Sequence, residues 1–207
     1  MKKMKRAFLL LVVLLFVLPP KGIEAHPEET CRAGGEEIGW KIGCGGGYGH
    51  IGPHERRMAY DMSKLPAEYQ SIVVEGAKRW NDTGIVDFRE AAVGQKSTGT
   101  MDVYNDEETS VIAAVWVQIN YEDHFNRYGN YRTNHIKSWE MKFNLAQTTH
   151  RSFEENAAVA AHEFGHTIGL HDLYEKHNSE KLMYGYMTPA QHSPTKKDIE
   201  GALEAVK

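Results

Sequence analysis

Residues 157–172 read AAVAAHEFGHTIGLHD, and this stretch decides how the rest of the chain must be arranged. On an α-helix, His162 and His166 stand four residues apart and project from one face, so that two imidazoles can converge on one metal ion. Glu163 follows the first histidine. Its carboxylate is thereby placed beside the metal, where it can take a proton from a water molecule on that metal.

The helix that carries this pair has sequence signals at both ends. Ser152, with Glu155 three residues later, forms a capping box that predicts the helix start. Gly169 predicts its end, because a residue without Cβ can adopt the left-handed conformation that turns the chain back. The turn returns His171 and Asp172 toward the histidine pair, and either residue could supply a third ligand. Requiring Gly at the eighth position of the pattern and Asp or His at the eleventh lowers its chance occurrence to about one chain in two thousand. This favours a metal site over a buried amphipathic helix whose histidines satisfy each other.

The first 25 residues are typical of a secretory signal peptide. A basic start is followed by a twelve-residue apolar run, Ala7 to Leu18, and by a polar exit that ends at Ala25. Twelve apolar residues are too few for a permanent membrane anchor. We therefore expect a secreted protein with a signal peptide at 1–25, an N-terminal segment at 26–55 and one enzymatic domain at 56–207.

The net charge and the cysteine content further limit the class of protein to which the chain can belong. Residues 1–25 hold five Lys or Arg and one Glu, so removing them changes the net charge from −4 to about −8. A secreted acidic protein is a poor candidate for binding nucleic acid, and we expect a monomer without a nucleic-acid partner. Cys31 and Cys44 are even in number, so a disulfide between them is the default in an oxidising compartment. A cysteine bound to the metal in a latent form is the alternative.

Between 26 and 55 the chain is rich in glycine and shows no helical or strand periodicity, which predicts a loop or a short pro-segment. His50 and His54 repeat the four-residue spacing, but their Gly- and Pro-containing context favours exposed side chains over a second metal site. Farther on, the acidic cluster Asp106, Glu107 and Glu108 is a candidate calcium site, although a solvated turn is the stronger interpretation.

The remaining patterns indicate one sheet and its covering helices. Pro66 introduces a helix over 67–80 whose apolar stripe should pack on a sheet. Thr195 and Asp198 predict the start of a last amphipathic helix. Tyr121 to Ser138 is polar and is expected to form a long surface loop. Strands are predicted at residues 56–63, 85–91, 100–105, 111–119 and 139–146.

These motifs resemble the metzincin clan of zinc endopeptidases, whose pattern His-Glu-x-x-His-x-x-Gly-x-x-His is followed by a methionine turn. His162, Glu163, His166 and Gly169 match, and the sequence LMY at 182–184 is similar to that turn, with Met183 as the hydrophobic floor. The resemblance covers about residues 56–206. It implies an α+β fold with a twisted, mostly parallel sheet of about five strands, two long helices and a C-terminal helix.

The departure from the pattern lies at its eleventh position, which is Asp172. Secreted bacterial neutral proteases similar to snapalysin use Asp there, in a Gly-Leu-x-Asp-x-Tyr context that residues 169–174 match. The resemblance therefore implies Asp172 as the third zinc ligand. His171 is its rival, because imidazole is a common zinc ligand. Neighbouring residues of an extended segment point to opposite sides, so only one of the two can face the metal.

The expected function is that of a secreted zinc endopeptidase acting on protein or peptide substrates. Zinc on His162, His166 and Asp172 would leave one position for water, with Glu163 as general base. The substrate is expected to lie antiparallel along the strand edge at 111–119, and Tyr184 and Tyr186 are expected to wall its pocket. Two alternatives stay open: a catalytically silent zinc-binding adhesion or interaction module, and a processing protease or toxin specialised for one partner.

Overall fold

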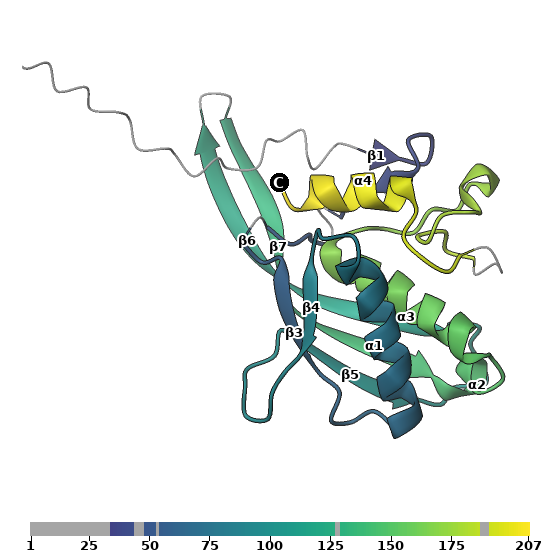
Figure 1. Cartoon of the computed structure of the whole chain (residues 1–207). Helices are drawn as coiled ribbons and strands as arrows, with labels where there is room; N and C mark the ends of the chain where they lie inside the picture. The colour runs from purple at the N-terminus through teal and green to yellow at the C-terminus, as the bar shows by residue number, and fades with distance from the viewer. Residues whose placement is uncertain (1–33, 44–47, 53, 127–128, 187–190) are drawn as a thin grey trace, which may run out of the picture.

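The computed structural model describes residues 34–43, 48–52, 54–126, 129–186 and 191–207 (Figure 1). The predicted signal peptide and both cysteines, Cys31 and Cys44, lie outside the described residues, so the leader and the disulfide stay predictions. No helix in the described part of the chain has both the length and the apolar character that crossing a membrane requires.

A five-stranded, mostly parallel sheet lies at the centre of the molecule, which confirms the predicted α+β class. Its strands follow the order β4-β3-β5-β7-β6, and only β6 runs antiparallel to its neighbour β7. Strand β6 therefore forms one edge of the sheet. The strands are β3 (Arg57–Asp61), β4 (Asp87–Glu90), β5 (Gly99–Tyr104), β6 (Ala113–Asn126) and β7 (Gly129–Asn144).

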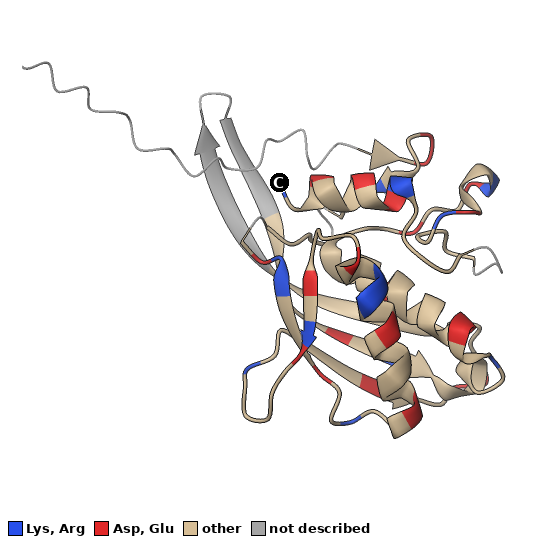
Figure 2. Cartoon of the chain, in the orientation of Figure 1, with Lys and Arg blue, Asp and Glu red and all other residues tan. Residues whose placement is uncertain are grey.

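Two long helices, α1 (Ala67–Asn81) and α3 (Phe153–Ile168), lie together on one face of this sheet (Figure 1). A shorter helix, α4 (Lys196–Ala205), closes the chain, while α2 (Leu145–Thr148) and the 3₁₀ turn η1 (Lys176–Asn178) are single turns. The capping boxes predicted for α3 and α4 are both formed. In α1, an acidic residue lies in the first turn and basic residues lie in the last, which complements the helix dipole (Figure 2).

Helix α3 is held on the sheet by the aromatic residue between its two histidines. Phe164 lies two positions from each, so the helical period turns its ring to the opposite side. That ring is fully buried, with its centroid 4.5 Å from Phe88, 5.6 Å from Tyr60 and 5.9 Å from Trp139. The sheet thereby fixes the rotation of α3, and with it the direction in which the histidines point.

Gly76 sets how closely α1 and α3 approach. A Cβ at this position would lie 2.6 Å from the Cβ of Ala160 and 2.8 Å from the backbone nitrogen of Ala161. Gly76→Ala is therefore expected to destabilise the fold by about 1–3 kcal/mol, although a free helix would gain about 1 kcal/mol from the same change. Urea unfolding at a fixed metal concentration measures the difference.

The matched control is Val74→Ala, an exposed site on the same helix, which should change the free energy of unfolding by no more than about 0.5 kcal/mol. A Gly76→Ala protein more stable than the wild type would contradict the close packing of the two helices.

The prediction of a surface loop from Tyr121 to Ser138 is wrong. Strands β6 and β7 pair through this region from Ile119 opposite Ile136 to Asn126 opposite Gly129, and Figure 1 shows them running past the rest of the sheet. A two-stranded ribbon outside the core needs no apolar face, because each strand satisfies the backbone hydrogen bonds of the other. A polar sequence is therefore compatible with it.

The glycine-rich segment is also more ordered than predicted. Strands β1 (Gly34–Gly35) and β2 (Trp40–Lys41) form a small antiparallel hairpin. His50, expected to be exposed, is fully buried, with its Nδ1 atom 2.8 Å from the carbonyl oxygen of Ala205, whereas His54 is exposed. The backbone around His50 joins the core, because the Ile51 nitrogen donates to the Ile168 carbonyl at the end of α3.

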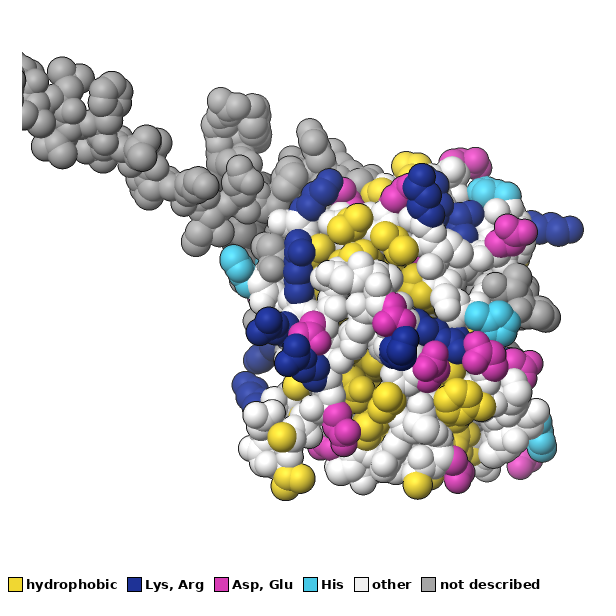
Figure 3. All heavy atoms as spheres, in the orientation of Figure 1, with side chains coloured by type: hydrophobic (Ala, Val, Ile, Leu, Met, Phe, Trp, Pro, Cys, Tyr) yellow, Lys and Arg dark blue, Asp and Glu magenta, His cyan; other side chains and the backbone are white. Residues whose placement is uncertain are grey.

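On the face seen in Figure 3, acidic and basic side chains lie interspersed, so that neither sign forms a continuous field there. Asp87 illustrates this pattern, because its carboxylate lies 3.6 Å from the Nε atom of Arg57 and 2.5 Å from an Nη atom of Arg89. Such exposed pairs contribute little to stability.

Candidate metal centre

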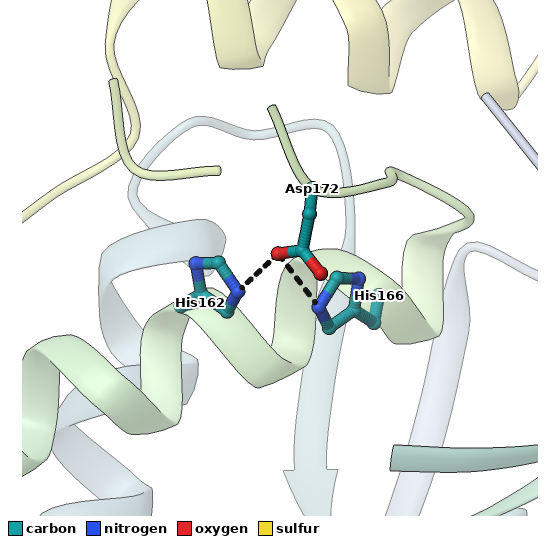
Figure 4. A group of neighbouring side chains, drawn as sticks. All are labelled: His162, His166 and Asp172. Carbon is teal, nitrogen blue, oxygen red and sulfur yellow. Dashed lines mark ion pairs between the residues drawn. The ribbon is translucent and has the colours of Figure 1, made fainter. Parts of the chain in front are cut away.

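Three side chains from two segments meet above α3. Figure 4 shows His162 and His166 projecting from one face of the helix, with Asp172 reaching toward both from the segment that follows Gly169. One Asp172 carboxylate oxygen, Oδ1, lies 3.0 Å from Nε2 of His162 and 3.6 Å from Nε2 of His166. Gly169 makes the return possible with a left-handed φ of 116°. The three ligand atoms lie within 4.8 Å of one another and could hold a metal ion.

The outer nitrogens of both rings are fixed by the backbone. Nδ1 of His162 lies 2.7 Å from the Leu182 carbonyl oxygen, and Nδ1 of His166 lies 2.8 Å from the Leu170 carbonyl oxygen. Each Nδ1–H can donate to its carbonyl, which leaves the Nε2 lone pair for a metal, as histidine ligands in proteins require. The candidate ligand atoms thus face one another as a metal site requires, and backbone carbonyls hold both histidine rings in the matching orientation.

His171, the rival third ligand, lies outside this group. Its ring packs against Tyr48 at 4.4 Å between centroids, and burial lowers its pKa to about 4. Its backbone nitrogen donates to the Lys41 carbonyl, which helps to hold the segment with Asp172 on the metal side. The second oxygen of Asp172, Oδ2, accepts a hydrogen bond of 3.1 Å from the Tyr174 hydroxyl.

The charges in the group depend on one another. Burial by itself would lower the pKa of His162, but the bond to Asp172 and the charge of Glu163 raise it to about 9. Burial opposes ionisation of Asp172 as well, yet the two histidines hold the pKa of its carboxyl well below the usual range. The contact with Asp172 thus favours the protonated form of His162, and metal binding must compete with that proton.

Glu163 lies beside the group and takes no part in it. Its side chain is buried, and its Oε2 atom has no hydrogen-bond partner among the described residues. Burial raises the pKa of its carboxyl, an effect that the neighbouring histidines partly offset. A buried carboxyl with a raised pKa at the edge of a cleft is suited to carrying a proton.

A cleft in two parts runs past the candidate ligands beside strand β6. The first part, of about 740 Å³, is walled by residues 114–117 of the strand, and the second, of about 570 Å³, by residues 110–112. Glu163, His166, Asp172 and Tyr174 line both parts. The group thus lies midway along a groove whose far wall is the edge of the sheet.

The two predicted pocket tyrosines differ in position. Tyr186 is exposed and lines the second part of the cleft, where its ring centroid lies 5.5 Å from that of Tyr174. Tyr184 is buried, lies 5.6 Å from Tyr186 between ring centroids, and does not line the cleft. Tyr184 packs behind Tyr186, on the side away from the cleft. Tyr186 is therefore the one of the two that a substrate could touch.

Met183 forms the floor beneath the helix. It is buried, and a Cβ on Gly165 would lie 2.3 Å from its sulfur, so Met183 fills the space that the glycine leaves. The turn is fixed by Asp198, whose carboxylate accepts hydrogen bonds from the backbone nitrogens of Leu182 (3.0 Å) and Met183 (3.1 Å). Asp198 was predicted as a helix cap. Its second contact, with the methionine turn, was not.

Glu36, in the β1–β2 turn, holds the segment that follows Asp172, and no sequence pattern singled it out. Its carboxylate accepts hydrogen bonds from the backbone nitrogens of Tyr174 (2.9 Å) and Glu175 (3.1 Å) and from the Asn178 amide (2.7 Å). Burial raises the pKa of its carboxyl, but these hydrogen bonds outweigh that effect and lower it overall. The N-terminal hairpin is thus part of the frame that presents Asp172.

Glu36→Ala is expected to weaken metal binding about 10–100-fold, the usual effect of removing a group that orients a ligand. Titration with a competing chromophoric chelator measures the affinity. Glu37→Ala, at the exposed neighbouring position, removes the same charge and should leave affinity unchanged. Equal losses in the two variants would show that charge alone, and not the hydrogen bonds, is responsible.

The acidic cluster proposed as a calcium site forms an exposed turn. The Asp106 side chain accepts a hydrogen bond of 2.9 Å from the backbone nitrogen of Glu108, and Glu107 and Glu108 are exposed. Within the described ranges, His162, His166 and Asp172 are the single group of three or more potential ligands gathered as at a metal site. His50 and His54 do not belong to such a group.

No protein-family model matches the chain, and a search of curated proteins finds no significant relative.

Proposed function

We propose that the chain is a secreted zinc-dependent endopeptidase of the metzincin type that its sequence resembles. The observation that carries the proposal is the buried carboxylate of Glu163, whose Oε2 atom has no hydrogen-bond partner among the described residues, beside the group of His162, His166 and Asp172. A structural metal site takes four protein ligands and has no use for such a carboxylate. A hydrolytic site needs it as an acid and base.

The donor set supports zinc as the metal. Two imidazole nitrogens and one carboxylate oxygen suit zinc, and three protein ligands leave a coordination position open, as catalytic sites do. When bound there, zinc supplies Lewis acidity, which polarises a carbonyl and brings the pKa of a water molecule to about 7.

The protein itself moves the proton and orients the ligands. Glu163 receives a proton from water at Oε2 and returns it to the nitrogen of the leaving amine. Its raised pKa suits this double role, because the carboxyl must hold the proton between the two steps. The carbonyls of Leu182 and Leu170 keep both histidine rings in the same orientation during these steps.

The open edge of β6 is the proposed substrate platform. An extended peptide can add to it as a further antiparallel strand, with backbone hydrogen bonds supplying affinity and the two parts of the cleft receiving side chains. Cleavage would then fall at Glu163 and the ligand group, which line both parts.

Metal removal tests the proposal. A chelator should abolish cleavage of an unstructured protein such as denatured casein, and stoichiometric zinc should restore it, because the metal supplies the Lewis acid. Unfolding caused by metal loss is checked by circular dichroism of the chelated protein. Full cleavage by protein shown to contain no metal would overturn the proposal.

A further inference from the structure

Apart from the two candidate histidine ligands, Arg151 is the basic side chain among the described residues that line the second part of the cleft. Arg151 lies in the short link between α2 and α3, two residues before α3 begins. The two helices meet at the lower right of Figure 1. Its side chain is half-buried, and its Nε atom donates a hydrogen bond of 3.1 Å to the Gln147 carbonyl. The head group is thus held in place by the end of α2, and no described residue forms a hydrogen bond with its two terminal nitrogens.

No carboxylate among the described residues forms an ion pair with Arg151. The two nearest in sequence form their hydrogen bonds elsewhere: Glu155 accepts from the backbone and hydroxyl of Ser152, and Glu154 pairs with Arg79 at 2.7 Å. The charge of Arg151 contributes to the lowered pKa of Glu155, but the two form no ion pair. A half-buried guanidinium attracts a carboxylate more strongly than a fully solvated one, because its surroundings screen the charge less.

The charges of the catalytic group do not cancel that attraction. The second part of the cleft contains two acidic residues, Glu163 and Asp172, whose combined charge a divalent metal would offset. On the proposed function, Arg151 is then the charged side chain that remains among the described residues lining this end, although the carboxylate of Glu155 lies near enough to feel its charge. It would therefore act on whatever side chain the substrate places there.

The direction of β6 determines which part of a bound peptide lies beside Arg151. The chain passes from residues 110–112, in the Arg151 part of the cleft, to residues 114–117 in the other part. A peptide paired antiparallel to β6 runs the opposite way. Its residues after the cleaved bond therefore lie beside Arg151, and those before the bond lie in the part that contains Lys41.

From this arrangement we infer that the enzyme selects substrates with Asp or Glu among the first residues after the cleaved bond, and that Arg151 binds the carboxylate of that residue. The inference rests on the proposed peptidase activity and adds its substrate class. The guanidinium forms a charge-assisted, two-pronged contact with the carboxylate, which an uncharged amide of the same shape cannot match.

Matched peptides test the inference. Each pair differs only by Glu or Gln at the first, second or third position after the cleaved bond, and kcat/KM is measured for both members. The wild type should prefer Glu by about tenfold at one of these positions. Arg151→Gln should remove the preference, and Arg151→Glu should transfer it to a peptide with Lys. Arg151→Lys should retain part of it.

Lys41→Gln is the matched control, since it removes a positive charge from the other part of the cleft. It should leave the Glu-to-Gln ratio after the bond unchanged. Equal cleavage of Glu and Gln peptides by the wild type would overturn the inference and leave the peptidase proposal standing. A wild type that retains bound zinc and cleaves no peptide would overturn both. A preference that survives in Arg151→Gln would assign the selection to another residue.

Discussion

Glu163→Gln is expected to lower peptide turnover by about 10²–10⁴-fold while the protein keeps its metal. The amide has nearly the same shape as the carboxylate, and the group of His162, His166 and Asp172 remains complete. On the proposed function, what is lost is the ability to accept a proton from water and return it to the leaving amine. Steady-state kinetics on a fluorogenic peptide, with metal content measured on the same preparation, gives both quantities.

The control for this change lies on the same helix. Glu154→Gln alters an exposed carboxylate that pairs with Arg79 and does not line the cleft. It should keep turnover close to that of the wild type. Wild-type turnover in Glu163→Gln would remove Glu163 from the mechanism, whatever the metal content.

Asp172→Ala is expected to weaken zinc binding by at least about 100-fold, since the loss of an outer group that merely orients a ligand already costs about 10–100-fold. His171→Ala should keep both zinc and most activity, because its ring packs against Tyr48 and stands outside the ligand group. Asp172→His should retain zinc, since imidazole can serve as the third ligand.

Metal content of the three purified variants, measured by mass spectrometry after dialysis against a weak chelator, decides between the two residues. Zinc retained in Asp172→Ala and lost in His171→Ala would show that the third ligand had been assigned to the wrong neighbour.

The parts of the fold that were predictable are those with local signals. Helix α3 has its cap at Ser152, its apolar run and its terminal Gly169 within one short stretch, and each of these positions is where the sequence predicted it. Strands β3, β4 and β5 have apolar residues bounded by turn residues, and their predicted limits differ from the observed ones by a few residues. Local propensity and packing point the same way in these elements.

The β6–β7 ribbon and the N-terminal hairpin could not be predicted in this way. Their polar or glycine-rich sequences are compatible with a loop, and strand pairing alone selects the extended form. Glu36 lies 138 residues before its partner Tyr174, and Asp198 lies 15 residues after Met183. Hydrogen bonds from a side chain to a distant backbone leave no periodic pattern. The hydrogen bonds that position the site were therefore less predictable from the sequence than the candidate metal ligands.

Digestion of a diverse peptide library by the purified protein tests the central claim most directly, with products identified by mass spectrometry and Glu163→Gln as the blank. The proposal predicts new internal cleavages that disappear with a chelator and are absent from the blank. Cleavage of a single peptide class would indicate a partner-specific protease. A zinc-loaded protein that leaves the whole library intact would contradict the claim and favour a silent zinc-binding module.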